Sequence, residues 1–126
     1  MGIVQAIVKM SNPTNDKLAT IEVTCLVDSS ATYLCIPQHV ANQLSLKELQ
    51  KREVTLADGG KKLVPYVGPI KVEFENRLCF VGAMVLGEQA LLGAIPMEDM
   101  DLIIHPKLLK LSVNPDSPNV AQGLAM

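Results

Sequence analysis

The sequence predicts a single, predominantly β domain, and three observations support this. Short apolar runs alternate with a period of two, clusters of turn-forming residues separate them, and a length of 126 residues suits one domain. Hydrophobic residues make up 48% of the chain and charged residues 19%, so the chain can bury a core and is too apolar to be disordered. We therefore expect an all-β fold with one or two short helices.

Three strands and one helix are predicted in the amino-terminal part of the chain. The strands are runs rich in β-branched and apolar residues that end at turn-forming residues, and they cover Gly2 to Met10, Thr20 to Val27 and Tyr33 to Ile36. The backbone N–H at the first position of a helix has no partner within the helix, so a proline there costs no hydrogen bond. Pro37 therefore predicts a helix over Gln38 to Leu44.

A hairpin with a polar tip is predicted in the middle of the chain. Asp58-Gly59-Gly60 is a strong turn signal between two candidate strands, Arg52 to Ala57 and Lys61 to Val67. Pro65 and Pro69 cannot donate to a strand ladder, so the returning arm should bend or run along an edge.

Short strands and a helical turn fill the rest of the expected domain, which spans residues 1–115. The predicted strands are Ile70 to Phe74, Leu78 to Leu86, Ala90 to Gly93, Leu102 to His105 and Leu109 to Val113, with a helical turn over Ile95 to Met100. Residues 116–126 are expected to form a loosely ordered tail.

Composition argues against several classes of partner. The formal net charge is −2, aromatic residues make up 3% and Trp is absent, so we expect no nucleic-acid partner. The longest uncharged apolar stretch, Leu78 to Gly87, is far shorter than the ~18 residues that suggest a membrane span. We expect no metal, because the two histidines lie far apart without a cluster of ligands. Three cysteines without paired spacing, and no secretory signal, predict a cytoplasmic protein with reduced thiols.

Asp28 is the strongest candidate for a catalytic group. It follows an apolar run, Cys25-Leu26-Val27, so we expect the carboxyl to lie in a largely buried environment that shifts its pKa. The alternative is that Asp28 followed by Ser29 and Ser30 is an ordinary turn or capping element.

The order of three motifs resembles the retropepsin-like aspartic proteases, the single-lobe relatives of pepsin, and among them the bacterial single-domain members. The resemblance covers roughly residues 2–115. Leu26-Val27-Asp28-Ser29-Ser30-Ala31-Thr32 stands where the family has Asp-Thr/Ser-Gly-Ala/Ser after an apolar strand. Leu56-Ala57-Asp58-Gly59-Gly60-Lys61-Lys62 matches the flap hairpin, and Ala90-Leu91-Leu92-Gly93-Ala94-Ile95-Pro96 matches the aliphatic strand that closes on glycine before a short helix.

The resemblance implies a closed retropepsin-like acid-protease barrel and an aspartic endopeptidase. Aspartic proteases use two carboxylates that share one proton, and one chain supplies one motif residue, so the partner is a second copy and the dyad is Asp28 from each chain. The Ser29 hydroxyl would brace the two loops across the interface. Substrate contacts would come from Ala31 and the flap tip, Asp58, Gly59 and Gly60. The substrate would be a peptide or protein, with no cofactor.

Ser30 departs from the pattern, because the family has glycine at this position. Serine keeps the amide but adds a Cβ and a hydroxyl beside the dyad. The alternative function is therefore a catalytically silenced domain that binds peptides or only dimerises. The hairpin at Asp58 likewise has two interpretations, a mobile flap or an ordinary surface turn.

Overall fold

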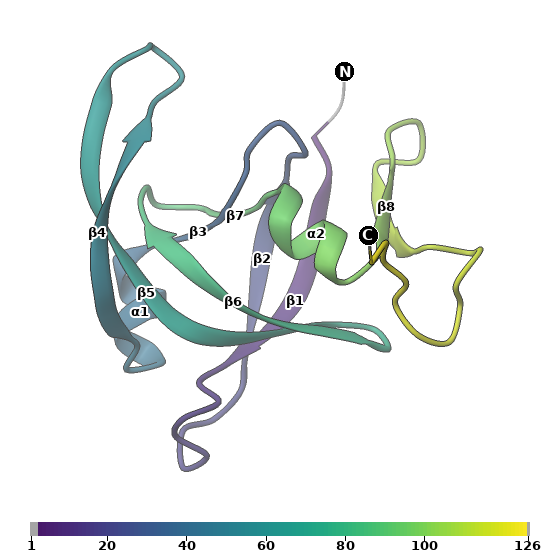
Figure 1. Cartoon of the computed structure of the whole chain (residues 1–126), viewed down its shortest axis with the longest axis horizontal. Coiled ribbons are helices and arrows are strands. Elements are labelled where there is room, and N and C mark those ends of the chain that lie inside the picture. The colour runs from purple at the N-terminus through teal and green to yellow at the C-terminus, as the bar shows by residue number, and fades with distance from the viewer. Residues whose placement is uncertain (1–2, 126) are drawn as a thin grey trace.

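The computed structural model describes residues 3–125, and its core is a closed β barrel (Figure 1). The elements are β1 (Gln5–Ser11), β2 (Ile21–Val27), β3 (Leu34–Ile36), α1 (Gln38–Gln43), β4 (Lys47–Thr55), β5 (Lys61–Phe74), β6 (Arg77–Val85), β7 (Ala90–Leu92), α2 (Ala94–Asp99), β8 (Leu102–His105) and β9 (Lys110–Val113). The all-β prediction with two short helices is confirmed.

Six strands close the barrel. The sheet runs in the order β1-β2-β7-β3-β6-β5-β4, and an additional pairing of β1 with β5 closes a ring that leaves β4 alone outside it. Two of the pairings are parallel, β2 with β7 and β3 with β6. Strands β8 and β9 form a separate two-stranded sheet.

Alternating side chains fill the barrel, as the period of two predicts. In β1 every second residue is buried, including Val8 and Met10, and β2 buries Cys25 and Val27 in the same way. Helix α1 closes one side with Val40, which is buried. Burying these side chains against one another is the main source of stability for such a small barrel.

Three sequence predictions about the strands need correction. Strand β1 begins at Gln5, whereas Gly2, where it was expected to begin, lies outside the described residues. Strand β4 begins at Lys47 rather than Arg52, because it is an edge strand whose first five residues are all exposed and therefore show no alternation. The two strands expected between Lys61 and Phe74 are one strand, β5, with a shift of register between Val67 and Ile70.

One of the prolines acts differently from the prediction. Pro37 caps helix α1 in an extended conformation instead of occupying its first helical position. Pro65 lies in the part of β5 that pairs with β4 alone, so the returning arm has a free edge at this point, as predicted. It faces Lys51 of β4, and the pairing of β5 with β6 begins only at Tyr66, so no β6 partner lies opposite its missing N–H.

The carboxyl-terminal segment is attached to the barrel by hydrogen bonds around Asp101. Ser117 is buried, its hydroxyl donates to the Asp101 carboxylate, and its carbonyl accepts from the Arg77 guanidinium. Asn114 Nδ2 and the Gln122 amide also donate to Asp101, each at 3.1 Å. These donors lower the pKa of Asp101, the Ser117 hydroxyl first. Asp101 therefore anchors the segment that follows β9.

No helix in the described part of the chain is long and apolar enough to cross a membrane.

Candidate functional site

Asp28 lies directly after β2, at the point where this strand leaves its parallel partner β7. The two strands are in register from Cys25 opposite Ala90 to Val27 opposite Leu92. The Asp28 amide continues the ladder by donating to the Leu92 carbonyl at 3.1 Å. The backbone of Asp28 is therefore fixed by the barrel while its side chain projects from it.

Two donors from Ser30 hold the Asp28 carboxylate. Oδ1 accepts from the Ser30 amide at 2.9 Å and from the Ser30 hydroxyl at 2.6 Å. The hydroxyl, and secondly the amide, lower the pKa of Asp28 below its ordinary value of 3.8, because both stabilise the charged form. The expectation of a buried carboxyl is wrong for the single chain: the strand ends at Val27, and Asp28, Ser29 and Ser30 are all exposed.

The Ser30 side chain lies in the open. The crowding expected from replacing the motif glycine does not occur within one chain, since Ser30 is exposed and its hydroxyl points back to Asp28. The amide donation to the carboxylate is kept. The effect of the serine is therefore electrostatic, through a second donor on the same oxygen.

The loop that carries Asp28, residues 28–33, rests on the turn between β7 and α2. The Ala31 carbonyl accepts from the Ala94 amide at 2.8 Å, and the Thr32 carbonyl accepts from the Ile95 amide at 2.9 Å. Gly93 permits this approach, because a Cβ there would lie 2.4 Å from the Tyr33 carbonyl oxygen. The runs that end at Asp28 and Gly93 are thus neighbouring parallel strands, and the Asp28 loop accepts hydrogen bonds from the first two residues of α2.

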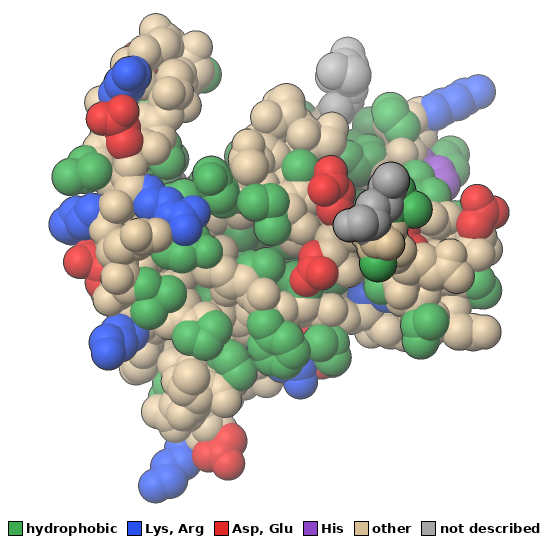
Figure 2. Space-filling view, viewed as in Figure 1, with side chains coloured by type: hydrophobic (Ala, Val, Ile, Leu, Met, Phe, Trp, Pro, Cys, Tyr) green, Lys and Arg blue, Asp and Glu red, His purple; other side chains and the backbone are tan. Residues whose placement is uncertain are grey.

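A cleft of about 550 Å³ separates this loop from the β4–β5 hairpin. Figure 2 shows the hairpin standing away from the rest of the molecule, with a hollow between them where hydrophobic side chains gather. The lining residues come from the Asp28 loop, the barrel strands and one hairpin arm: Ser30, Ala31, Thr32, Tyr33, Cys35, Glu53, Val54, Thr55, Leu56, Ala57, Met84, Leu86 and Leu91. A mostly apolar cleft of this shape can hold an extended peptide.

The residues expected to contact substrate do not all line the cleft. Ala31 lines the cleft, whereas Asp58, Gly59 and Gly60 form the exposed hairpin tip beyond it. The tip is a tight turn in which the Gly60 amide donates to Asp58 Oδ1 at 2.8 Å and Gly59 has a φ of +85°.

Sequence reasoning missed most of the cleft wall. The hairpin contributes Glu53 to Ala57 to the wall. These residues directly precede the turn at Asp58, from which the hairpin was predicted. Tyr33 and Met84 also line it, although no pattern in the sequence brings these two residues together. Period-two alternation assigns side chains to a face of a strand but does not reveal which faces of distant strands meet.

A second hollow, of about 400 Å³, lies beside the carboxylate on another face. It is lined by Asp28 and Ser29 with apolar residues around them: Ile3, Val4, Leu26, Val27, Leu91, Ile104 and Pro106. Ile3 is 70% exposed, and the β8–β9 turn exposes Leu108 by 63% and Leu109 by 46%. Exposed apolar surface of this kind is typical of a protein contact.

The cysteines are free thiols, as expected. Burial raises the pKa of Cys25 to about 12, and burial together with the negative charge of Asp99 does the same for Cys79. Cys35 is half-buried in the cleft wall, and burial raises its pKa as well. Thiols of raised pKa are poor nucleophiles, so none of the three competes with Asp28 as a candidate catalytic group.

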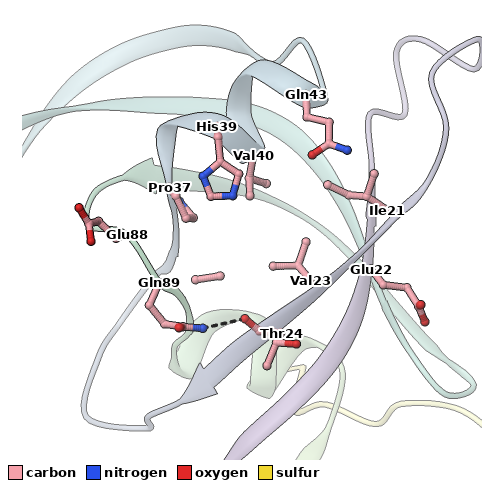
Figure 3. A pocket seen from close by; sticks show the side chains of 11 residues that line it. Ile21, Glu22, Val23, Thr24, Pro37, His39, Val40, Gln43, Glu88 and Gln89 are labelled. Atoms are coloured by element: carbon pink, nitrogen blue, oxygen red, sulfur yellow. Dashed lines mark hydrogen bonds between the residues drawn. The ribbon is translucent and has the colours of Figure 1, made fainter.

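A smaller pocket of about 280 Å³ lies between α1 and β2 (Figure 3). Its wall includes His39 and Gln89, and the Gln89 amide donates to the Thr24 carbonyl at 2.9 Å. Neither Asp28 nor the hairpin contributes to it, so it is separate from the candidate site.

No family model matches this sequence, and neither does any curated protein. Among solved structures, the chain is similar to the protease of simian foamy virus (mac), determined in solution. The identity is 15% and the TM-score 0.45, over 73% of this chain and 91% of that chain.

Proposed function

We propose that this protein is an aspartic endopeptidase whose catalytic dyad forms from Asp28 of two identical chains. The observation that carries the proposal is the position of Asp28: an exposed carboxylate on a braced loop, beside a cleft that a hairpin overhangs. The three ordered motifs of the retropepsin-like pattern fall on this loop, on the hairpin and on the turn beneath the loop. The apolar hollow around Asp28 and Ser29 supports a second copy meeting the chain at this face.

The chemistry needs one protonated and one ionised carboxyl. In the single chain Ser30 keeps the pKa of Asp28 low, so its carboxyl is ionised near neutral pH. When two such groups meet, they cannot both ionise cheaply, and the pair titrates together with one pKa raised.

Peptide hydrolysis follows from that pair. The ionised Asp28 removes a proton from water, whose oxygen attacks the scissile carbonyl carbon while the protonated Asp28 gives its proton to the carbonyl oxygen. Breakdown of the tetrahedral intermediate breaks the C–N bond: the leaving nitrogen takes up the proton from one Asp28, and a hydroxyl of the intermediate gives its proton to the other Asp28 as the C=O bond re-forms. The dyad thus ends with one proton, as it began. Neither a metal nor a cofactor takes part in this sequence of steps.

The test is cleavage of a diverse peptide library by the purified protein from acidic to neutral pH, with the oligomeric state recorded on the same samples. Cleavage by a dimer supports the proposal. Intact peptides from a well-folded dimer would contradict it.

A second candidate, a silenced domain that only binds peptide, is favoured by one contact. The Ser30 hydroxyl occupies an oxygen of the carboxylate that water or the second Asp28 would otherwise use. If this is the function, the cleft binds peptides in the wild type and in Asp28→Asn alike, without cleavage.

Replacing Ser30 tests how the extra donor acts on Asp28. Ser30→Gly removes the hydroxyl and keeps the amide, so the pKa of Asp28 should rise toward 3.8. Because the depressed pKa keeps Asp28 ionised to lower pH, the acidic limb of kcat/KM should move to higher pH in the variant. NMR titration of the Asp28 side-chain carbonyl carbon measures the shift directly, and Ser45→Gly, which makes the same change at an exposed position outside the cleft and the apolar hollow, is the control. An unchanged Asp28 titration in Ser30→Gly would contradict the assignment.

A further inference from the structure

Arg52 of β4 lies between two tyrosine rings that come from different parts of the chain. Its guanidinium carbon is 3.8 Å from the centroid of the Tyr66 ring and 5.6 Å from the centroid of the Tyr33 ring. Both distances lie within the range of cation–π contacts. Tyr66 belongs to β5, whereas Tyr33 ends the loop that carries Asp28, so Arg52 joins the hairpin to that loop.

The Tyr66 ring is itself held against the barrel. A Cβ on Gly82 of β6 would come within 2.2 Å of the Tyr66 ring, so the ring packs directly against the Gly82 backbone. Gln50, two residues before Arg52 on the same face of β4, adds a further support. With its amide oxygen toward the guanidinium, it accepts from Nε at 2.8 Å and from Nη2 at 3.0 Å. Arg52 makes no ion pair with a carboxylate of residues 3–125. Its guanidinium is therefore positioned by the two tyrosine rings and the side-chain amide of Gln50.

Arg52 also sits where the hairpin loses its support from the barrel. Strand β5 pairs with β6 only from Tyr66 onward, and its residues Lys61 to Pro65 pair with β4 alone. Arg52 lies opposite Val64, at the base of this outer ribbon, which comprises residues 51–55 and 61–65. An isolated two-stranded ribbon is marginally stable in water, so lateral contacts at its base determine how firmly it is held.

The ribbon forms one wall of the cleft. Glu53 to Ala57 line the cleft on the hairpin side, and Tyr33 lines it on the side of the Asp28 loop. Tyr33 lines the neighbouring groove too, together with Arg52. The contact between Arg52 and Tyr33 thus connects the hairpin wall of the cleft to the Asp28-loop wall. It lies where the cleft meets the neighbouring groove.

We propose that Arg52 is a positioning residue that ties the β4–β5 hairpin to the Asp28 loop and so sets the width of the cleft. Its guanidinium stacks between Tyr66 on the hairpin and Tyr33 on the loop. The consequence for cleavage rests on the proposed function, but the consequence for the hairpin does not.

Backbone hydrogen exchange of the outer ribbon tests the proposal in the full chain. In Arg52→Ala the ribbon amides should exchange between about five-fold and about thirty-fold faster, the range for losing a partly buried cation–π contact. Lys51→Ala is the matched control, since Lys51 is the exposed neighbour whose ammonium pairs with Glu48 at 3.1 Å. Arg52→Lys should restore little of the protection, because an ammonium cannot lie flat between two rings. Equal exchange in Arg52→Ala and Lys51→Ala, or full rescue by lysine, would overturn the proposal.

A double-mutant cycle separates this tie from a general loss of stability. If Arg52 acts through Tyr33, then Tyr33→Leu should also speed ribbon exchange, and combining it with Arg52→Ala should add little. Fully additive effects would contradict the tie. Far-UV circular dichroism checks that each variant is folded.

Cleavage kinetics of Arg52→Ala provide a second, independent measurement. A looser hairpin should raise KM for a peptide more than it lowers kcat, because the Asp28 loop keeps its hydrogen bonds to the turn after β7. If the wild type cleaves nothing while Arg52→Ala still loosens the ribbon, the proposed function fails and the tie stands. If cleavage occurs and the ribbon does not respond, the tie fails and the function stands.

Discussion

Asp28→Asn should abolish peptide cleavage while leaving the fold intact. General acid–base groups contribute factors of about 10² to 10⁴, and in the proposed dimer this single substitution removes both members of the dyad. An asparagine keeps the side-chain oxygen that accepts from the Ser30 amide and hydroxyl, at 2.9 and 2.6 Å in the wild type. The loop should therefore keep its conformation, and the loss should appear in kcat.

The measurement is the rate of cleavage of a peptide selected from the library, compared with thermal unfolding of the same samples. Asp16→Asn is the matched control: it makes the same chemical change at an exposed position in the loop between β1 and β2, outside both the cleft and the apolar hollow. Cleavage that persists in purified Asp28→Asn would show that another group carries the chemistry.

Gly93→Ala should destabilise the fold and disturb the Asp28 loop. The new Cβ would lie 2.4 Å from the Tyr33 carbonyl oxygen and 2.8 Å from the Ala31 carbonyl oxygen. These are backbone atoms, so relief needs a movement of the loop rather than a side-chain rotation. Overpacking of this kind costs about 3 kcal/mol, which lowers the Tm of a domain of this size by about 10 °C.

Gly123→Ala is the control for this substitution, because no atom lies within 4 Å of the Cβ it would add. Chemical denaturation of both variants measures the difference in the free energy of unfolding. A loss at Gly93 no larger than the loss at Gly123 would mean that the loop does not rest on the turn as described.

Much of the barrel could be predicted because its signals are local. Strand β2 alternates over its whole length, and the polar turn at Asp58 marks the hairpin. Helix α2 follows a short aliphatic strand, where the sequence predicts a helical turn, and it buries Met97. In each case neighbouring residues in the sequence contain the information.

The remaining features depend on contacts between distant segments. The first half of β4 is exposed throughout because it lies outside the ring, so no alternation marks it. The low pKa of Asp28 comes from a side chain two residues away that curls back on it, which residue types alone do not determine. The cleft wall and the stacking of Arg52 between Tyr33 and Tyr66 join segments that only the closed barrel brings together.

The central claim is that Asp28 from two chains forms one site, and mixing wild-type and Asp28→Asn chains tests it most directly. After subunit exchange in an equal mixture, random pairing leaves about one quarter of the dimers with two wild-type chains. If both carboxyls are needed, the cleavage activity should fall to about one quarter of that of the same amount of wild-type dimer. An activity of about one half would show that each chain works alone, and would contradict the shared dyad.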